Sequence, residues 1–263
     1  MSFMQIIVFI LQKYGLSMLR GAGISLYLAF VGTAGGCVIG FICGILTTIP
    51  SSKRDNPVKR AVLYVVRLVI NIYVEVFRGT PMMVQAMFIY YGVKLLWGLN
   101  LENLTAGLVI ITVNTGAYMA ESVRGGIISV DPGQTEGAQS IGMTHFQTML
   151  YVIIPQALRN IMPQIGNNLI INVKDSCVLS VISVVELFFA SKGAAGAYYR
   201  NFEVYTVTMV MYLIMTVSLS RLLRFVERKM DGPKNYRLAA GDQLAPTSGM
   251  LSAPKREDVR DGR

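Results

Sequence analysis

The stretch from Ile24 to Ile49, ISLYLAFVGTAGGCVIGFICGILTTI, contains no charged side chain. A helix needs roughly 20 predominantly apolar residues to cross the hydrocarbon core of a bilayer. This stretch is long enough, and further apolar runs follow it along the chain. The pattern predicts an all-α integral membrane protein with several spans. The late start of the run, and the apolar runs after it, are unlike a cleaved signal peptide.

The composition of the 263-residue chain agrees with membrane insertion, because 53% of its residues are hydrophobic and only 15% are charged. Soluble domains carry about 25% charged residues. The net charge of +9 could have indicated nucleic acid, but the basic residues cluster beside the apolar runs, at 53–60 and 221–229. Basic residues in these places are typical of loops that set the orientation of membrane spans beside the lipid. We therefore expect no nucleic-acid partner. The three cysteines have no metal-ligand spacing, so no metal is expected.

About five spans are expected from the apolar runs. The dipeptide Thr80-Pro81 is a helix start signal, and it separates two helical pieces. The first piece, 61–78, is expected to lie along the cytosolic face. The fourth run is interrupted by prolines and by the pair Lys174-Asp175. We place the spans at about 24–49, 81–96, 104–123, 151–190 and 204–220.

Lysines and arginines predict the orientation of these spans. They are far more frequent in 51–67, 124–160 and 221–237 than in the segments on the other side. The positive-inside rule therefore places the N-terminus outside the cell and the C-terminus in the cytosol. We divide the chain into an external N-terminal segment, a transmembrane domain and a tail expected to be disordered and cytosolic, at 1–20, 21–230 and 231–263.

Glycines recur at every fourth position of the first span, at Gly36, Gly40 and Gly44. Such spacing lets a second helix approach closely on one face. Alternatively, these residues reflect only the general frequency of glycine in membrane helices.

The loop at about 128–150 is predicted to form two short helices joined by a bend. Asp131 precedes a proline and has a glutamine three residues later, which is a helix start signal. Thr144 and Gln147 repeat the capping-box spacing, and Gly142 can end the earlier helix. Such a loop is either a docking surface for another protein or an ordinary interfacial connection.

A resemblance to a known family decides between these alternatives. Glu136-Gly137-Ala138, three residues, Gly142, nine residues and then the segment Val152-Ile153-Ile154-Pro155 resemble the EAA signature of permease subunits of binding-protein-dependent ABC importers. The chain departs from that signature at Gly137, Val152 and Ile154. Four further segments, between 76 and 182, resemble the polar amino acid branch of the family, the histidine, glutamine and arginine type.

The resemblance implies the type I ABC importer permease fold in a bacterial cell (inner) membrane. It implies a second, identical or homologous permease subunit, an ATP-binding cassette ATPase dimer, an external substrate-binding protein and a polar amino acid as substrate. The loop would be the coupling helix that contacts the ATPase, through Glu136, Gly137, Ala138, Gly142 and Pro155. The chain contains no G-x-x-x-x-G-K-[ST] loop, so we expect it to hold no cofactor and to leave ATP and Mg to the ATPase.

Charged and polar residues within the apolar runs are candidates for the substrate pathway, because such groups usually face a cavity or one another. Glu121 can pair with Arg124 three residues later, either as an interfacial ion pair or as part of a gate. The others either line a pathway or form a structural network. The candidates are Arg78, Thr80, Asn114, Glu121, Lys174, Asp175, Ser176 and Glu186.

The expected function is therefore transport of polar amino acids driven by a separate ATPase. A self-sufficient secondary transporter or channel is the alternative, but it would need no docking loop. A membrane enzyme has little support, because His145 is the only histidine and no nucleophile–base pair or metal set accompanies it. We expect the chain to have no enzyme activity of its own.

Overall fold

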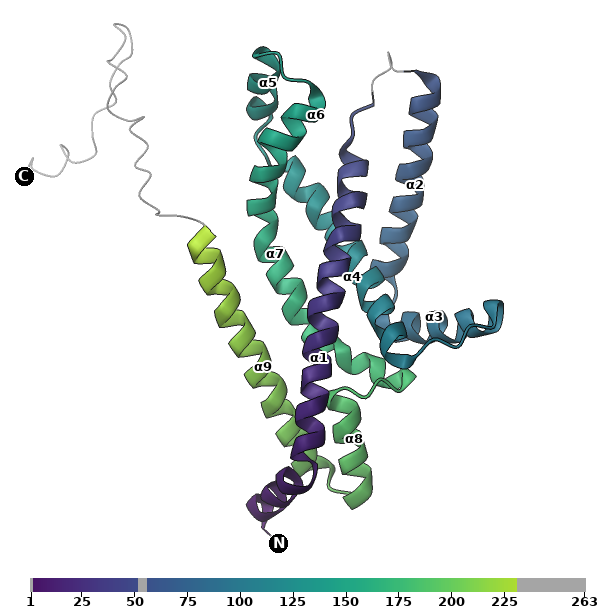
Figure 1. Cartoon of the computed structure of the whole chain (residues 1–263), viewed down its shortest axis with the longest axis vertical. Helices are drawn as coiled ribbons and strands as arrows, with labels where there is room; N and C mark the ends of the chain where they lie inside the picture. The colour runs from purple at the N-terminus through teal and green to yellow at the C-terminus, as the bar shows by residue number, and fades with distance from the viewer. Residues whose placement is uncertain (1, 52–55, 231–263) are drawn as a thin grey trace, which may run out of the picture. The chain divides into compact units, whose positions relative to one another are not determined.

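The computed structural model describes residues 2–51 and 56–230, and within them the regular secondary structure is helical throughout. The prediction of an all-α protein is confirmed. The elements are α1 (Phe3–Thr48), α2 (Pro57–Gly79), α3 (Met82–Trp97), α4 (Asn103–Ile128), α5 (Pro132–Ser140), α6 (His145–Thr148), η1 (Met149–Ile153), α7 (Ile154–Asp175), η2 (Ser176–Ile182), α8 (Leu187–Tyr198) and α9 (Asn201–Met230) (Figure 1).

Helix α1 begins much earlier than the apolar run that predicted it. Its first turn is closed by a capping box, in which the Ser2 hydroxyl accepts from the Gln5 amide and the Gln5 side chain accepts from the Ser2 amide. The segment 3–20 therefore belongs to the same helix, and Lys13 and Arg20 lie on it. The Ser-x-x-Gln spacing was the signal for this start.

The glycines of α1 lie against α4, so the close approach predicted from their spacing is confirmed. A Cβ at Gly36 would stand 2.6 Å from Cβ of Thr115, and one at Gly44 would stand 2.6 Å from Cβ of Val123. These partners also recur at spacings of four on α4. The glycines of α1 thus let the backbones of the two helices approach each other closely.

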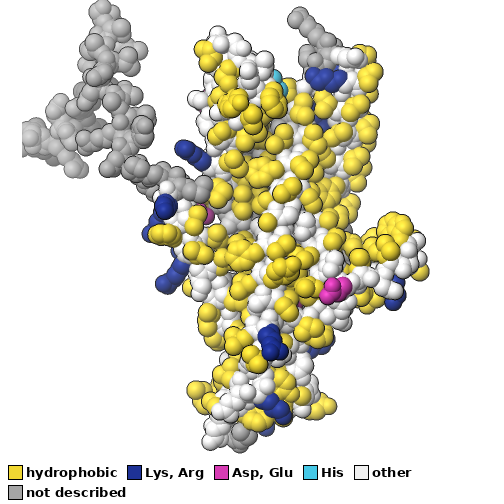
Figure 2. Space-filling model, viewed as in Figure 1, with side chains coloured by type: hydrophobic (Ala, Val, Ile, Leu, Met, Phe, Trp, Pro, Cys, Tyr) yellow, Lys and Arg dark blue, Asp and Glu magenta, His cyan; other side chains and the backbone are white. Residues whose placement is uncertain are grey.

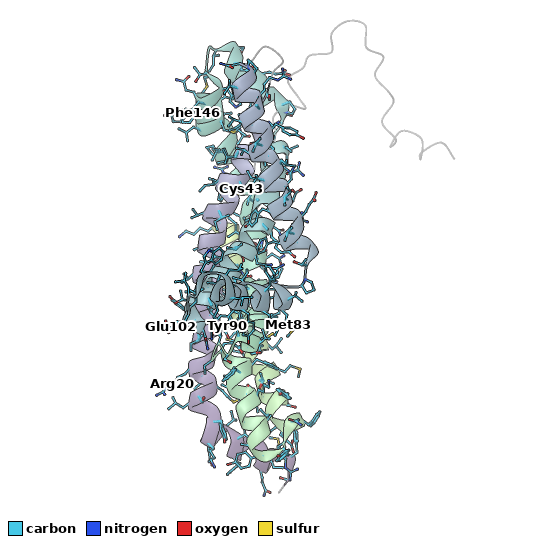
Figure 3. All side chains as sticks on the ribbon, turned by 90° about the vertical axis from the view of Figure 1, so that its right-hand side faces the viewer. Arg20, Cys43, Met83, Tyr90, Glu102 and Phe146 are labelled. Carbon is cyan, nitrogen blue, oxygen red and sulfur yellow. The ribbon has the colours of Figure 1, made fainter. Side chains whose placement is uncertain are left out.

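Helices α2 and α3 are oriented in the opposite way to our expectation. Helix α2 runs lengthwise beside α4, whereas α3 lies crosswise to the bundle (Figure 1). The view turned by 90° agrees, because Met83 and Tyr90 of α3 lie at one height (Figure 3). The prediction that 61–78 lies flat and 81–96 crosses was wrong. The reason is the bend between them, which side chains from α3 and α4 hold.

Two of the described helices, α1 and α9, are long and apolar enough to cross a membrane, and α7 with α8 forms a third if the bent pair is one span. Helix α3 is apolar but shorter. The count of about five spans remains a prediction. Large apolar side chains cover the flank of the molecule, and basic side chains gather nearer the helix ends (Figure 2).

The α5–α6 loop lies at one end of the bundle, together with the C-terminal end of α1 and the N-terminal end of α2 (Figure 1). The N-terminus and α8 lie at the opposite end. Apolar side chains of α1 pack against α8 and α9 at that end and against α3 and α4 further along the bundle. The predicted tail, 231–263, lies outside the described residues.

Candidate functional site

The connection between α2 and α3 is a fixed bend. Thr80 is extended, with φ −122° and ψ 148°, and its hydroxyl donates to the carbonyl of Val76 at 2.7 Å. Helix α3 starts after Pro81, although no side chain caps it. Thr80 therefore ends α2. The prediction that Thr80 caps the next helix was wrong, because Pro81 occupies that position.

Gln85 holds this bend from the second turn of α3. Its side-chain amide nitrogen lies 2.9 Å from the carbonyl oxygen of Phe77 and 2.8 Å from that of Thr80. Its side-chain oxygen accepts from the Asn114 amide of α4 at 2.8 Å. Gln85 is buried, and sequence reasoning missed it. An amide in an otherwise apolar helix, just after a break, was the available signal.

A second set of amides ties α7 to the bundle. The Asn172 side chain donates to the Thr33 hydroxyl of α1 at 2.8 Å and to the Thr115 hydroxyl of α4 at 2.9 Å. One turn earlier, Asn168 donates to the Met119 sulfur and to the Gln164 carbonyl. Each amide lies in a buried position where an unpaired polar group would be costly. These residues also escaped sequence reasoning.

These two sets of residues enclose a cavity of about 400 Å³ between the bend, α4 and α7. Thr80 and Pro81 come from the bend, and Asp175 is the only charged residue among the described residues of the lining. Asp175 is half-buried, and within the described chain its carboxylate accepts no hydrogen bond and forms no ion pair. The remaining lining residues are Met82, Asn114, Thr115, Tyr118, Gln164, Asn168, Ile171 and Asn172.

The predicted pathway residues are thus only partly brought together. Thr80, Asn114 and Asp175 line the cavity, and Arg78 lies beside it, with its guanidinium carbon 5.7 Å from the ring centre of Tyr118. The next turn of α4 carries the predicted Glu121 ion pair, in which Arg124 Nε donates to the carboxylate at 3.1 Å.

The other three candidates lie elsewhere. Lys174 is exposed and does not line the cavity. Ser176 is buried, and its hydroxyl donates to the Val173 carbonyl at 2.9 Å, which is a local helix contact. Glu186 is fully buried at the start of α8. The predicted set is therefore not one site, because the helical turn at η2 separates the cavity from Glu186.

Glu186 forms a closed hydrogen-bond network. Its carboxylate accepts from the backbone amides of Phe188 at 2.8 Å and Phe189 at 2.7 Å, which caps α8. It also accepts from the hydroxyls of Tyr212 at 2.8 Å and Ser25 at 3.3 Å. The carboxylate thus joins α8 to α9 and α1. This arrangement is structural, because all its partners belong to the bundle.

The predicted loop has the expected shape. Thr144 and Gln147 form the predicted capping box, and Gly142 has φ +85°, the left-handed conformation predicted for the bend. The prediction for α5 was correct at its cap, because Asp131 accepts from the Gly133 amide at 2.7 Å. Gln134 is not part of that cap, since its side chain accepts from Gln156 of α7 instead.

The surface of this loop is partly apolar. Glu136 and Gly137 face solvent, whereas Ala138 is buried. Ile141 is 78% exposed and Phe146 is 73% exposed, and Phe146 lies near one end of the bundle (Figure 3). Large apolar side chains at this exposure indicate a surface for protein contact. Pro155 lies on the first turn of α7, directly after the π-helical turn η1.

Comparison with known proteins identifies the family. Residues 60–232 match the model of the binding-protein-dependent transport system inner membrane component. The chain belongs to this family. It is a permease subunit of an ABC importer and an inner membrane component. Membership implies an ATPase partner and a substrate-binding partner. Permease subunits of this class are not themselves enzymes.

Relatives of known function share most of the chain. The glutamine transport system permease protein GlnP of Escherichia coli K12 is 36% identical over 81% of this chain and 92% of its own length. The arginine transport system permease protein ArtQ of Bacillus subtilis 168 is 30% identical over 81% of this chain and 91% of its own length.

Solved structures share the fold. A crystal structure of an amino acid ABC transporter with histidines is 36% identical and superimposes with a TM-score of 0.74, covering 87% of this chain and 99% of that one. The inward-facing MetNI methionine ABC transporter superimposes with a TM-score of 0.67 over 81% of this chain and 96% of that one, at 22% identity. The predicted type I permease fold is confirmed.

Proposed function

We propose that this permease subunit imports polar amino acids and that the cavity beside the α2–α3 bend is part of the translocation pathway. The relatives named for glutamine and arginine transport support the substrate class. The observation that carries the site is the cavity itself, which is lined by side-chain amides, hydroxyls and one carboxylate. Its volume of about 400 Å³ falls in the range of small-molecule sites, about 300–1,000 Å³.

The lining matches the chemistry of an amino acid. The substrate's ammonium group can pair with the Asp175 carboxylate, which accepts no hydrogen bond and forms no ion pair among the described residues. The substrate's carboxylate can accept from the side-chain amide of Gln164 and from the hydroxyl of Tyr118. A bend between two helices leaves backbone groups near such a ligand, as in many transporters. The site is therefore suited to a small zwitterion.

The α5–α6 loop is the coupling element in this proposal. Glu136 and the exposed Ile141 and Phe146 offer one acidic and two apolar contacts to an ATPase surface. The ordered caps and the bend at Gly142 keep the loop rigid, so that a movement of the ATPase is transmitted to α4 and α7. ATP and Mg are held by the ATPase dimer, and this chain holds no cofactor.

We further propose the assembly and its orientation. The N-terminal end of α1 faces the external substrate-binding protein, and the α5–α6 end faces the cytosol. The C-terminus, which lies outside the described residues, is proposed to be cytosolic as well. Basic residues near the α1–α2 connection and the end of α9 support this orientation. A second permease subunit, identical or homologous, completes the pathway in the bacterial inner membrane.

Reconstitution tests the function directly. The chain would be inserted into liposomes with its second permease subunit, ATPase and binding protein, and uptake of labelled glutamine, arginine and histidine would be measured. We expect uptake of at least one polar amino acid that requires both ATP and the binding protein. Accumulation driven by a sodium or proton gradient without the ATPase would contradict the proposal and support a secondary transporter.

The coupling role is tested by Glu136→Lys, with Glu102→Lys as the matched control. Both glutamates are exposed, but Glu102 lies before α4, away from the α5–α6 loop (Figure 3). We expect Glu136→Lys to insert normally and to lose ATP-driven uptake and stimulation of ATP hydrolysis. The control should keep both. Equal uptake in the two variants would remove Glu136 from the mechanism.

A further inference from the structure

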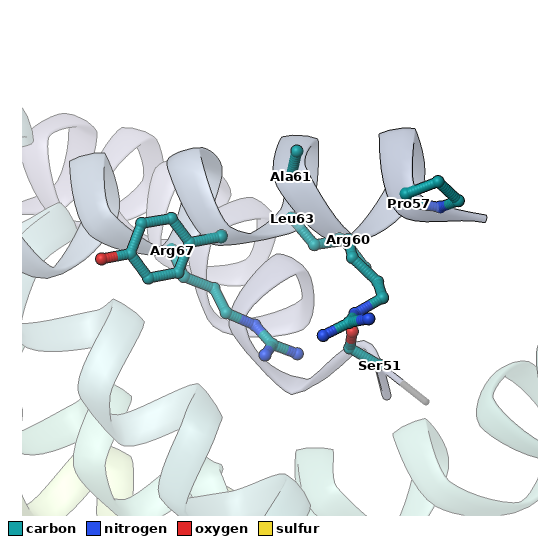
Figure 4. Close-up of a pocket in the computed structure, with 7 residues that line it drawn as sticks. Ser51, Pro57, Arg60, Ala61, Leu63 and Arg67 are labelled. Carbon is teal, nitrogen blue, oxygen red and sulfur yellow. The ribbon is translucent and has the colours of Figure 1, made fainter. Parts of the chain in front are cut away.

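A second cavity lies far from the proposed pathway, between the end of α1 and the first turns of α2. It has a volume of about 490 Å³, and its polar lining comes from Ser51, Arg60, Tyr64 and Arg67 (Figure 4). The guanidinium groups of Arg60 and Arg67 point into the same space beside Ser51. Among the described residues that line it, none carries a carboxylate. The cavity thus concentrates positive charge.

Helical geometry places these side chains on one face. Arg60 and Arg67 are seven residues apart, which is about two turns at 3.6 residues per turn. Tyr64 lies between them at the fourth position after Arg60, on the same face. The arrangement therefore follows from the regular helix and needs no unusual backbone conformation.

The hydrogen-bond donors of the two arginines are not used up. Arg67 donates to the carbonyl of Ile49, but its Nε is buried and has no partner among the described residues. Arg60 is exposed, and its guanidinium forms no hydrogen bond or ion pair with the described part of the chain. A guanidinium carries five N–H donors in a planar fork that fits phosphate oxygens. An anion with several oxygen atoms can therefore accept from both guanidinium groups.

The surroundings favour a lipid as the source of that anion. The cavity lies where α1, which is long and apolar enough to cross a membrane, ends. From the cavity, a row of exposed side chains runs along α2 at spacings of four, with Tyr64, Leu68 and Ile72 exposed by 69%, 46% and 52%. Basic pockets beside membrane helices bind anionic headgroups, and apolar rows accept acyl chains.

We propose that Arg60 and Arg67 bind the phosphate of an anionic phospholipid, whose acyl chain lies along Leu68 and Ile72 of α2. Free inorganic phosphate offers the same oxygen atoms but no apolar part. Binding of the lipid would strengthen the contact between the C-terminal end of α1 and α2, which Arg67 already makes through the Ile49 carbonyl, at the end of the molecule that carries the α5–α6 loop.

Native mass spectrometry of the assembled transporter in detergent tests this site. The complex would be titrated with phosphatidylglycerol, phosphatidylcholine and inorganic phosphate in parallel. We expect phosphatidylglycerol to bind most tightly. Its apparent affinity should fall about fivefold in Arg60→Gln and about 30-fold in Arg60→Gln/Arg67→Gln, because each basic side chain near an anionic headgroup contributes at this level.

The matched control is Arg221→Gln/Arg224→Gln, which removes the same charge from exposed positions of α9. It should change the affinity by less than twofold. Arg60→Gln removes an exposed side chain, so its folding is not in question. An equal loss of affinity in the control would show that the lipid is attracted by the general positive charge and not by this cavity. Inorganic phosphate binding as tightly as phosphatidylglycerol, or phosphatidylcholine binding equally well, would overturn the lipid assignment.

Discussion

Asp175 and Glu186 are two carboxylates of one short segment, yet their surroundings are opposite. Glu186 is fully buried and accepts four hydrogen bonds, from two backbone amides and two hydroxyls. Asp175 is half-buried, lines a cavity and accepts no hydrogen bond from the described residues. Both were predicted as pathway residues for the same reason, a charge inside an apolar run.

The difference separates a structural carboxylate from one available to a ligand. Burying a charge is costly unless hydrogen bonds or an opposite charge compensate it. At Glu186 the bundle supplies the compensation, so the carboxylate has no free capacity for a substrate. At Asp175 the compensation can come from water or from a bound ammonium group. The number of hydrogen bonds that a carboxylate already accepts from the protein therefore indicates whether it is available to a ligand.

Removing the saturated carboxylate should have the largest effect. Glu186→Ala leaves the amides of Phe188 and Phe189 and the hydroxyl of Tyr212 without an acceptor. We expect a loss of about 3–5 kcal/mol in the free energy of unfolding. Denaturant unfolding in detergent would measure it, with Glu102→Ala as an exposed control that changes stability by less than about 0.5 kcal/mol. Equal losses in both variants would contradict the assignment.

The unsaturated carboxylate should matter for transport and little for stability. Asp175→Asn keeps the size of the side chain but removes the charge that would pair with the substrate ammonium. We expect ATP-driven uptake to fall about 10- to 100-fold, the worth of one charged hydrogen bond. Unfolding in detergent should change by less than about 1 kcal/mol. Unchanged uptake, or a stability loss like that of Glu186→Ala, would contradict the distinction between the two carboxylates.

The close packing of α1 against α4 joins the helices that carry Ser25, a partner of Glu186, and Asn114, which lines the cavity. Gly40→Ala should disturb this packing. The added Cβ would stand 2.8 Å from the backbone carbon of Met119, so the helices must move apart. We expect a loss of about 1–3 kcal/mol in unfolding free energy. Gly23→Ala is the control, because a Cβ there meets nothing within 4 Å. A Gly40→Ala variant as stable as the control would disprove the tight interface.

The smallest effects are expected when either of two tyrosine hydroxyls is removed. Tyr212→Phe removes one of the donors to Glu186 and should cost about 1 kcal/mol in stability. Tyr118→Phe removes a hydroxyl that lines the cavity and makes no hydrogen bond among the described residues. It should leave stability within about 0.5 kcal/mol and lower uptake instead. Reversed effects would show that the two networks were assigned the wrong way round.

Local sequence signals predicted much of this structure. The capping box of Thr144 and Gln147, and the positive φ of Gly142, follow from neighbouring residues along the chain. The spacing of Gly36, Gly40 and Gly44 predicted a close helix partner. The same kind of signal at Ser2 would have placed the start of α1 correctly. The caps and the bend need no distant contact, because they depend on backbone groups within one turn.

Features that depend on contacts between helices were not predictable in this way. The crosswise course of α3 depends on Gln85 and Asn114, which are far apart in the sequence and bonded in the fold. Asn168 and Asn172 read as ordinary polar residues until α1 and α4 are seen beside them. Polarity within an apolar run signals a constraint but does not identify the partner.

The sequence by itself determined that this is a helical membrane protein of a known transport family, because apolar length, charge placement and motif spacing are properties of the linear chain. Only the tertiary structure decided which polar residues line the cavity and which form hydrogen bonds within the bundle. The physical reason is that the role of a buried carboxylate depends on its partners, and two partners of Glu186, Ser25 of α1 and Tyr212 of α9, are distant from it in sequence.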